Sequence, residues 1–427
     1  MILRGTSASS PPPCARRGRA SCGREDSGSP VTESASEGLC IGIVAGEASG
    51  DRLGAGLMAA LTAQCPGIRF LGAGGPAMRA AGLDCRIRSE RLTMNGFIEP
   101  LLRLPGLLRA RQRLRNDFAR AGIHGFIGID FNGFNLVLAR DLKRRGIPTS
   151  QFVSPAVYAW RSERLRYVHR ALDQVLALYP FEPPLYVDSG VEAVFVGHPL
   201  ADALTEPPER ALLRSEFGGA ACGGAACGGA DTGCVLAVMP GSRPAELTRM
   251  LDPFLDGVAR VQAARPDCLA LIAAVDAPAA GRIEAALRRG HPTVRARVVT
   301  GRSTDVLAAA DLALVKSGTG TLEAMLLGVP MVVAYRLDPL SAWLVRSRLR
   351  TPWVALPNIL AGEALVPELL QEAVTGAALA EGLLAQLPRT ACLRRRFAEL
   401  AQMLGRGASQ QAAGAFLDLL ARRGVLT

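Results

Sequence analysis

The stretches VMPGSR (residues 238–243) and KSGTGTLE (residues 316–323) decide the fold class of this chain. Each follows a short aliphatic run, at 235–239 and 312–315, and precedes a segment with helical patterning. They are therefore predicted to form turns at the carboxyl ends of neighbouring parallel strands, where open α/β sheets bind ligands. Backbone N–H groups and the helix dipole at such turns favour phosphate. The pair indicates a nucleotide-diphosphate site, and its expected lining residues are Gly241, Ser242, Arg243, Ser317, Gly318 and Thr319.

Composition limits what the protein can be. The chain has 427 residues, enough for two domains, and a formal net charge of +11. This charge favours anionic partners such as phosphorylated substrates, anionic lipid or nucleic acid. However, the only lysines are Lys143 and Lys316, and an arginine bias can also reflect codon usage. No apolar run approaches the ~20 residues of a membrane span. The ten cysteines show no repeated CxxC pair, so we expect reduced thiols, no metal and no cofactor.

Apolar runs alternate with helix-patterned segments from Leu39 onward, which predicts parallel sheets covered by helices on both faces. The strands expected in the first half lie at 41–45, 68–71, 125–129, 150–153, 174–178 and 194–196. The expected parts are a disordered tail at 1–38, a Rossmann-like domain at 39–205, a linker with a Gly/Ala-rich insertion at 206–234, a second Rossmann-like domain at 235–337 and a helical segment at 338–427. The last segment is expected to pack back on the first domain or on a partner subunit.

Two loops of the first half carry candidate polar groups. Asp130, in GID (128–130), follows a buried-looking strand. That position suits a general base for a sugar hydroxyl, and the alternative is a cap of the next helix. AGEASGD (45–51) suits an acceptor-binding loop, or an ordinary turn in which Ser49 or Asp51 caps a helix beginning near Arg52. Its candidate residues are Gly46, Glu47, Ser49, Gly50 and Asp51.

Three further side chains fit a sugar-nucleotide site. Arg161 closes the aromatic loop VSPAVYAWR (153–161), and His198 follows another expected strand. Rings and a guanidinium suit sugar stacking and phosphate contact, whereas a packed loop and a structural histidine are the alternatives. Glu323, on the first turn of a helix, suits a ribose diol, or simply complements the helix dipole.

Residues 97–120 interleave leucine with arginine. Leu107, Ala110, Leu114 and Phe118 share one helical face, with arginines over much of the rest. This pattern is typical of a helix at an anionic membrane surface, and also of an ordinary amphipathic helix. The candidate membrane contacts are Leu101, Leu104, Leu107, Leu108, Arg109, Arg111 and Arg113.

The chain resembles the lipid-A-disaccharide synthases, glycosyltransferases with two Rossmann-like domains facing across a cleft (the GT-B architecture). The motifs that carry the resemblance follow the family's order: AGEASGD (45–51), GAGGPAMRAAG (72–82), GID (128–130), VSPAVYAWR (153–161), LALYPFE (176–182), VGHPLAD (196–202), MPGSRPAE (239–246), KSGTGTLE (316–323), GVPMVVAYR (328–336) and LPNILAGE (356–363). The resemblance implies inverting, metal-independent transfer of 2,3-diacylglucosamine from its UDP derivative to 2,3-diacylglucosamine 1-phosphate. The products would be a β-1,6-linked disaccharide phosphate and UDP, formed at the inner face of the bacterial inner membrane.

The resemblance also implies roles for single residues. Asp130 matches the family's proposed base, and Arg243, Asn358 and Gln371 match its donor-binding positions. The leucine/arginine segment would dock on the membrane, and a homodimer can form through exchange of C-terminal segments. One departure concerns Asn132-Gly133, where the family usually has Pro-Asp, so a second carboxylate is missing.

Two other functions stay open from the sequence. A UDP-sugar 2-epimerase on the same fold would share the nucleotide site without the membrane segment, and it would not release UDP. A non-catalytic lipid- or nucleotide-binding relative is suggested only by the loss at Gly133. Nucleic-acid binding explains the charge but not the strand-end loops, so we expect no nucleic-acid partner.

Overall fold

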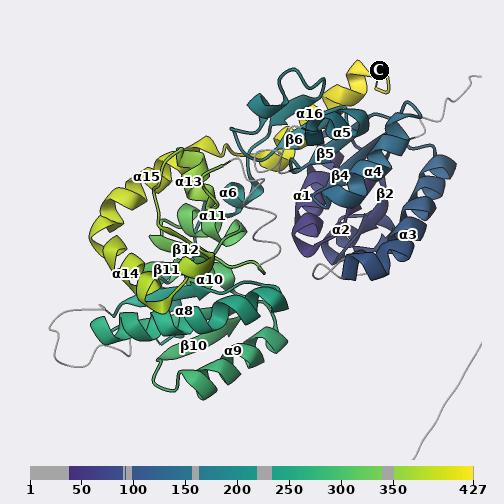
Figure 1. The fold of residues 1–427 in the computed structure, drawn as a ribbon. Coiled ribbons are helices and arrows are strands. Elements are labelled where there is room, and N and C mark those ends of the chain that lie inside the picture. Colours follow the sequence, from purple (N-terminus) through teal and green to yellow (C-terminus); the bar gives the residue numbers. More distant parts are fainter. Residues whose placement is uncertain are drawn as a thin grey trace, which may run out of the picture. The chain divides into compact units, whose positions relative to one another are not determined.

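The computed structural model describes residues 38–89, 92, 99–155, 163–218, 233–338 and 351–426, with no side-chain detail at 99–104. Residues 1–37 of the expected tail (1–38), Arg161, and residues 219–232 of the expected linker with its insertion (206–234) lie outside the described residues. So do the side chains of Leu101 and Leu104. The described part forms two parallel sheets with helices on both faces (Figure 1).

The first sheet has seven parallel strands in the order β3-β2-β1-β4-β5-β6-β7. Its strands are β1 Cys40–Ala45, β2 Arg69–Gly74, β3 Leu83–Arg88, β4 Gly125–Ile129, β5 Thr149–Phe152, β6 Gln174–Ala177 and β7 Glu192–Phe195. Every residue of β1 and β4 is buried, as expected of central strands covered on both faces. The helices before β8 are α1 Ala48–Gln64, α2 Pro76–Ala80, α3 Glu99–Ala121, α4 Asn132–Lys143, α5 Glu163–Ala171, η2 Pro183–Tyr186, α6 Pro199–Ala203 and α7 Arg210–Glu216. The last of these, α7, packs with Leu213 against the core of the second sheet.

The second sheet has six parallel strands in the order β10-β9-β8-β11-β12-β13. Its strands are β8 Val235–Met239, β9 Leu269–Ala274, β10 Ala296–Thr300, β11 Leu312–Lys316, β12 Met331–Tyr335 and β13 Glu368–Leu370. The helices that follow β8 are α8 Pro244–Ala264, α9 Ala277–Gly290, α10 Ser303–Ala308, α11 Thr319–Leu326, α13 Leu356–Ala361, η4 Gln371–Ala373, α14 Gly376–Gln386, η5 Leu387–Arg389, α15 Thr390–Met403 and α16 Ala408–Arg422.

The sequence-based prediction named no strand at β3 or β13, nor at β9, β10 and β12. β3 alternates buried and exposed residues and carries Asp84, Arg86 and Arg88, because an edge strand needs only one apolar face. β13 is three residues long and lies in the segment expected to be helical, yet it pairs with β12. Short edge strands leave no apolar run in the sequence, so periodicity does not reveal them.

The last helices of the chain pack against helices of both sheets. α14 packs on α8 beside the second sheet, whereas α16 packs on α1 beside the first. Phe416 on α16 is fully buried in the same cluster as Leu57 of α1. Asp202 anchors this return, because its carboxylate accepts hydrogen bonds from the N–H groups of Gly407 (2.7 Å) and Ala408 (2.9 Å) at the start of α16.

His198 takes part in the same junction. Its backbone N–H donates to the carbonyl of Leu404 (3.0 Å). Its imidazole Nδ1 accepts from the backbone N–H of Leu200 (3.1 Å) and so caps α6. Burial lowers the pKa of His198 to about 4, and the nearby charge of Asp202 opposes this only in part. The imidazole is therefore neutral at pH 7, with its proton on Nε2, and belongs to the frame of the fold.

Asp51 also has a framework role. The helix after AGEASGD begins at Ala48 rather than near Arg52, and Asp51 does not cap it. Instead its carboxylate, 4% exposed, accepts hydrogen bonds from the N–H groups of Gly75 (2.8 Å), Ala77 (2.9 Å) and Met78 (3.0 Å), and so caps α2. Neither composition nor periodicity could show this, because the two helices meet only in the folded chain.

Replacing Asp51 by Ala should lower the free energy of unfolding by roughly 2–4 kcal/mol, because buried N–H groups of α2 lose a charged acceptor. Urea unfolding followed by circular dichroism measures the change. Ser49→Ala, at an exposed position two residues earlier in α1, is the matched control and should stay within about 0.5 kcal/mol of the wild type. An Asp51→Ala protein as stable as the wild type would contradict the capping role.

His198 should remain neutral down to low pH. Since its folded pKa of about 4 lies below the ordinary value, its contribution to stability is complete above about pH 6.5 and is lost as the pH falls toward 4. The imidazole Cε1–H resonance, assigned by its loss in His198→Gln, should not shift between about pH 5.5 and 8. Titration of this resonance near pH 6.5 would show that the ring is not buried as described.

Candidate functional site

The candidate site residues follow the two pairs of strands at which strand order reverses. β1 and β4 are neighbours in the first sheet, but the chain runs from β1 to β2 on one side and from β4 to β5 on the other. In the second sheet β8 and β11 are likewise neighbours, with β9 and β12 on opposite sides of them. Such switch points form crevices at the carboxyl edge of a sheet. Glu47 follows β1, Asp130 follows β4, Arg243 follows β8 and Ser317 follows β11. The topology thus brings the predicted residues to two switch points.

The turn that carries Asp130 is held in an uncommon conformation. Asp130 (φ 46°) and Phe131 (φ 40°) are consecutive left-handed residues, which non-glycine residues seldom adopt. The Asp130 carbonyl accepts hydrogen bonds from Nδ2 of Asn135 (3.0 Å) and Nε2 of Gln151 (2.6 Å), two fully buried side chains. The Asp130 N–H donates to the Phe152 carbonyl (2.9 Å). Strain kept by such a network is typical of functional sites.

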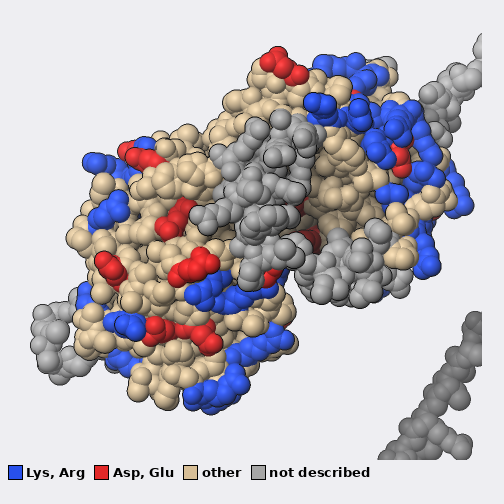
Figure 2. Space-filling view, viewed as in Figure 1, with Lys and Arg blue, Asp and Glu red and all other residues tan. Residues whose placement is uncertain are grey.

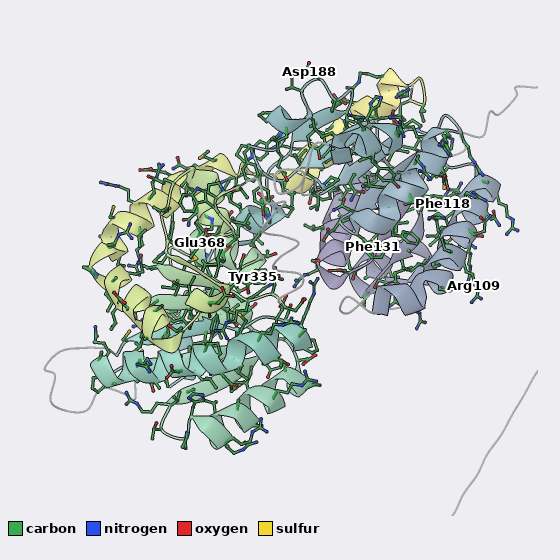
Figure 3. The ribbon with its side chains drawn as sticks, in the orientation of Figure 1. Arg109, Phe118, Phe131, Asp188, Tyr335 and Glu368 are labelled. Carbon is green, nitrogen blue, oxygen red and sulfur yellow. The ribbon has the colours of Figure 1, made fainter. Side chains whose placement is uncertain are left out.

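The first loop interlocks with this turn. A Cβ on Gly46 would lie 2.5 Å from the Phe131 ring, so only glycine fits there. Phe131 (labelled in Figure 3) stacks on Phe134, with ring centres 5.5 Å apart. Gly133 is different, because a Cβ there would meet nothing within 4 Å. A side chain at position 133 would therefore fit this turn without a clash.

The electrostatics around Asp130 favour a proton acceptor. Burial raises the pKa of the Asp130 carboxyl, and the negative charge of Glu47 raises it further. The Phe131 N–H and the charge of Arg243 act in the opposite direction without cancelling the rise. Arg243 Nη2 lies 3.6 Å from Glu47 Oε2, and 58% of the Arg243 side chain is exposed. A carboxylate of raised pKa beside an accessible guanidinium can accept a proton near a developing negative charge.

The PGSR turn differs from expectation in one respect. Oε2 of Glu246 accepts hydrogen bonds from the N–H groups of Ser242 (3.2 Å) and Arg243 (3.3 Å). A Cβ on Gly241, which has φ 119°, would lie 2.7 Å from the same oxygen. These two amides were expected to bind phosphate but are used inside the protein. The exposed guanidinium of Arg243 remains the group of this turn that can reach an anion.

The turn after β11 keeps the features of an anion site. Gly318 (φ 149°) precedes α11. The N–H of Thr321 donates to the Gly318 carbonyl (3.0 Å), whereas the first two N–H groups, of Thr319 and Gly320, lack acceptors within the helix. Ser317 Oγ donates to the Val354 carbonyl (2.9 Å), which ties the turn to the segment before α13. On α11, Glu323 accepts a hydrogen bond from the Thr304 hydroxyl. Burial raises the pKa of Glu323, against the opposing effects of Thr304 and the Arg52 guanidinium.

Asn358 is part of the frame behind this turn. It is fully buried, its Nδ2 donates to the Val366 carbonyl and to Glu368 Oε1, and its Oδ1 accepts from the N–H groups of Leu365 and Val366, all at 2.9 Å. Glu368 (labelled in Figure 3) also accepts from the N–H groups of Val354 and Ala355 at 2.9 Å. Asn358 therefore acts on the site through the backbone that Ser317 contacts.

Gln371 lies at the end of β13 in a left-handed conformation (φ 54°). Its Oε1 accepts from the Leu337 N–H (3.1 Å), and its carbonyl accepts from Arg336 Nε (3.0 Å). The side chain thereby fixes the chain that leaves β12. Among the remaining candidates, Ser49 is exposed, Gly50 is buried and His198 lies in the α6 junction.

α3 places its apolar face inward. Leu114 and Phe118 are fully buried, and Leu107 and Ala110 pack against the same cluster. In Figure 3, Phe118 marks the buried side of α3 and Arg109 its outer side. Leu107 itself is only half-buried against this core, so its contact with a membrane stays a prediction. Leu108 is 44% exposed, Arg109 and Arg113 are exposed, and Arg111 is half-buried.

Sequence reasoning gave no role to several residues that shape the site. Asn135, Gln151, Glu246, Lys316 and Glu368 are polar residues whose partners are distant backbone groups or charges. The usable signal was polarity within otherwise apolar segments. In the described part, no group of three or more His, Cys, Asp or Glu side chains can hold a metal ion.

The sequence model of the lipid-A-disaccharide synthetase family matches residues 41–392. The lipid-A-disaccharide synthase of Alkalilimnicola ehrlichii is 45% identical over 382 residues, which cover 88% of this chain and 97% of that protein. The corresponding Pseudomonas aeruginosa protein is 42% identical over 387 residues, covering 91% and 100%.

Solved structures resemble the fold at low sequence identity. The UDP-GlcNAc 2-epimerase of Neisseria meningitidis bound to UDP-GlcNAc has a TM-score of 0.61 at 11% identity, covering 89% of this chain and 99% of that chain. A glycosyltransferase of kitacinnamycin has a TM-score of 0.55 at 19% identity, covering 90% and 99%. These likenesses confirm the predicted two-sheet, GT-B fold class. Together with the family match and its extent, they lead to one conclusion: this chain belongs to the lipid-A-disaccharide synthase family.

Proposed function

We propose that the protein is an inverting glycosyltransferase that joins UDP-2,3-diacylglucosamine to 2,3-diacylglucosamine 1-phosphate. The products are the β-1,6-linked lipid A disaccharide 1-phosphate and UDP. The observation that carries the proposal is the family match over residues 41–392. The raised pKa of Asp130, next to Glu47 and Arg243, agrees with it.

In the proposed reaction, Asp130 takes the proton of the acceptor's 6-hydroxyl while that oxygen attacks the anomeric carbon of the donor. The bond between this carbon and the diphosphate oxygen breaks, and UDP leaves with its electron pair. A raised pKa makes Asp130 a better base near neutral pH. Arg243 and the N-terminus of α11 stabilise the charge that develops on the diphosphate. In this proposal Glu323, which also accepts the Thr304 hydroxyl, accepts hydrogen bonds from the ribose.

The 2-epimerase alternative rests on the fold alone. The epimerase of Neisseria meningitidis is only 11% identical to this chain, whereas the lipid-A-disaccharide synthases reach 45%. Transfer and epimerisation also differ in product, because a transferase releases UDP and an epimerase retains it in the product sugar. Measuring UDP therefore separates the two.

Acylated substrates require contact with a membrane, and we propose that the outer helices of the first sheet provide it. Among the described residues no helix has the length and apolarity needed to cross a bilayer. Figure 2 shows Lys and Arg gathered where Figure 1 places α3, α4 and α5. The exposed basic residues of these helices and of the turn after α4 include Arg109, Arg113, Arg120, Arg144, Arg145, Arg166 and Arg170.

Anionic lipid attracts such a surface, which supports peripheral binding at the inner face of the bacterial inner membrane. A homodimer by exchange would replace the packing of α16 on α1 with that of a partner, and it stays a prediction.

Asp130→Asn should reduce kcat/KM by at least about 10²-fold, because the amide cannot take the acceptor's proton. The assay follows disaccharide and UDP formation in detergent micelles from both proposed substrates. Asp188→Asn is the matched control, because Asp188 is also left-handed (φ 64°) but exposed in the turn before β7. The acid limb of the wild-type pH profile should lie above the ordinary aspartate pKa, in the direction of the Asp130 shift. Disaccharide formation by Asp130→Asn at the wild-type rate would exclude Asp130 as base.

Replacing Arg109, Arg111 and Arg113 by Gln should weaken binding to anionic phospholipid vesicles by up to roughly a hundredfold, because each arginine near the surface contributes about 1 kcal/mol. Co-sedimentation measures the binding, with neutral vesicles as reference. Arg282, Arg288 and Arg289, exposed on α9 of the second sheet, provide the matched triple control. Equal losses in both triple variants would favour a general charge effect over docking through α3.

A further inference from the structure

Lys316 is one of two lysines in a chain that otherwise uses arginine for its positive charge. Both lysines are confined. Lys143 Nζ donates to the carbonyls of His169 (2.9 Å) and Leu172 (2.5 Å). Lys316 Nζ lies 2.9 Å from Glu246 Oε1, and 17% of its side chain is exposed. An ammonium is a compact point charge, whereas a guanidinium is a wide planar fork. Shape as well as charge therefore matters at position 316.

The Lys316 ammonium lies between the two turns of the second switch point. Through Glu246 it is linked to the PGSR turn, because Glu246 accepts the N–H groups of Ser242 and Arg243. A Cβ on Gly318 would lie 3.5 Å from Lys316 Nζ, so the ammonium is also beside the turn that begins α11. It lies 5.1 Å from the centre of the Tyr335 ring (labelled in Figure 3).

Two cations lie at this switch point beside the starts of two helices. A cation near the N-terminus of a helix is unfavourable, because the helix dipole is positive there. Here an ammonium adjoins the start of α11, and Arg243 stands immediately before α8. Burial raises the pKa of Glu246, but the hydrogen bond and charge of Lys316 and the Arg243 N–H outweigh it, so the net pKa is lowered and the group is a carboxylate. Glu246 therefore faces Lys316 and two helix N-termini, while Arg243 also has Glu47 Oε2 at 3.6 Å.

We propose that the Lys316 ammonium binds the diphosphate of the sugar nucleotide, together with Arg243 and the N-terminus of α11, while Glu246 positions it. This inference rests on the proposed function and adds a donor-binding residue to it. An ammonium has three N–H donors, and Glu246 accounts for one of them. The diphosphate carries its charge before and during transfer. The contact should therefore lower the donor KM more than it raises kcat.

The test compares UDP with uridine, which has the base and ribose but no phosphate. Lys316→Met should raise the Kd of UDP and the donor KM about tenfold, since one charge-assisted contact is lost. The Kd of uridine should not change, and kcat should stay within about twofold. Lys316→Arg should recover part of the UDP affinity, because it restores the charge. Lys143→Met, which removes the other confined lysine, should bind UDP as the wild type does.

Three results would overturn the inference. Wild-type UDP affinity in Lys316→Met would show that the ammonium does not bind the diphosphate. Equal losses for UDP and uridine would show that Lys316 only supports the structure. Absence of UDP binding by the wild-type protein would refute the proposed donor itself. The last result is distinct from the first two, in which the wild type binds UDP and the proposed function stands.

Discussion

The carbonyl oxygen of Asp130 accepts hydrogen bonds from two buried side-chain amides, Asn135 and Gln151, and the site of the first sheet depends on this interaction. It holds two consecutive left-handed residues, which a free chain would avoid. The same interaction explains why glycine is needed at Gly128 and Gly46. A Cβ on Gly128 would lie 2.2 Å from Gln151 Oε1, and one on Gly46 would meet the Phe131 ring. The small residues of AGEASGD and GID thus make room for the side chains that fix the turn.

The second sheet uses carboxylates in the same way. Glu246 fixes the PGSR turn, and Glu368 with Asn358 fixes the backbone that Ser317 contacts. Asn358 uses both hydrogens and its oxygen inside the protein, so its effect on a ligand is indirect. The groups left facing outward are the guanidinium of Arg243 and, in part, the ammonium of Lys316. Buried polar residues position this site, and the cations give it its charge.

Much of the fold could be predicted because buried parallel strands are continuous apolar runs that end in turns of small residues. This placed β1, β4, β8 and β11 and the polar residues that follow them. β3 and β13 could not be predicted in this way, because edge strands can be short or polar. The direction of the apolar face of α3 was also undecided, since Leu114 and Phe118 fit a core as well as a membrane. Periodicity shows that a helix has an apolar face, but not whether that face packs on a protein core or on a membrane.

The sequence by itself determined the α/β class, the strands that precede the candidate turns and the residue types in those turns, because strand periodicity and turn chemistry are local properties. Only the tertiary structure decided which polar residues are available to a ligand. Asp51, His198 and Asn358 have internal partners, whereas the Arg243 guanidinium remains exposed. Hydrogen-bond satisfaction depends on groups brought together from distant parts of the chain. No local pattern contains that information.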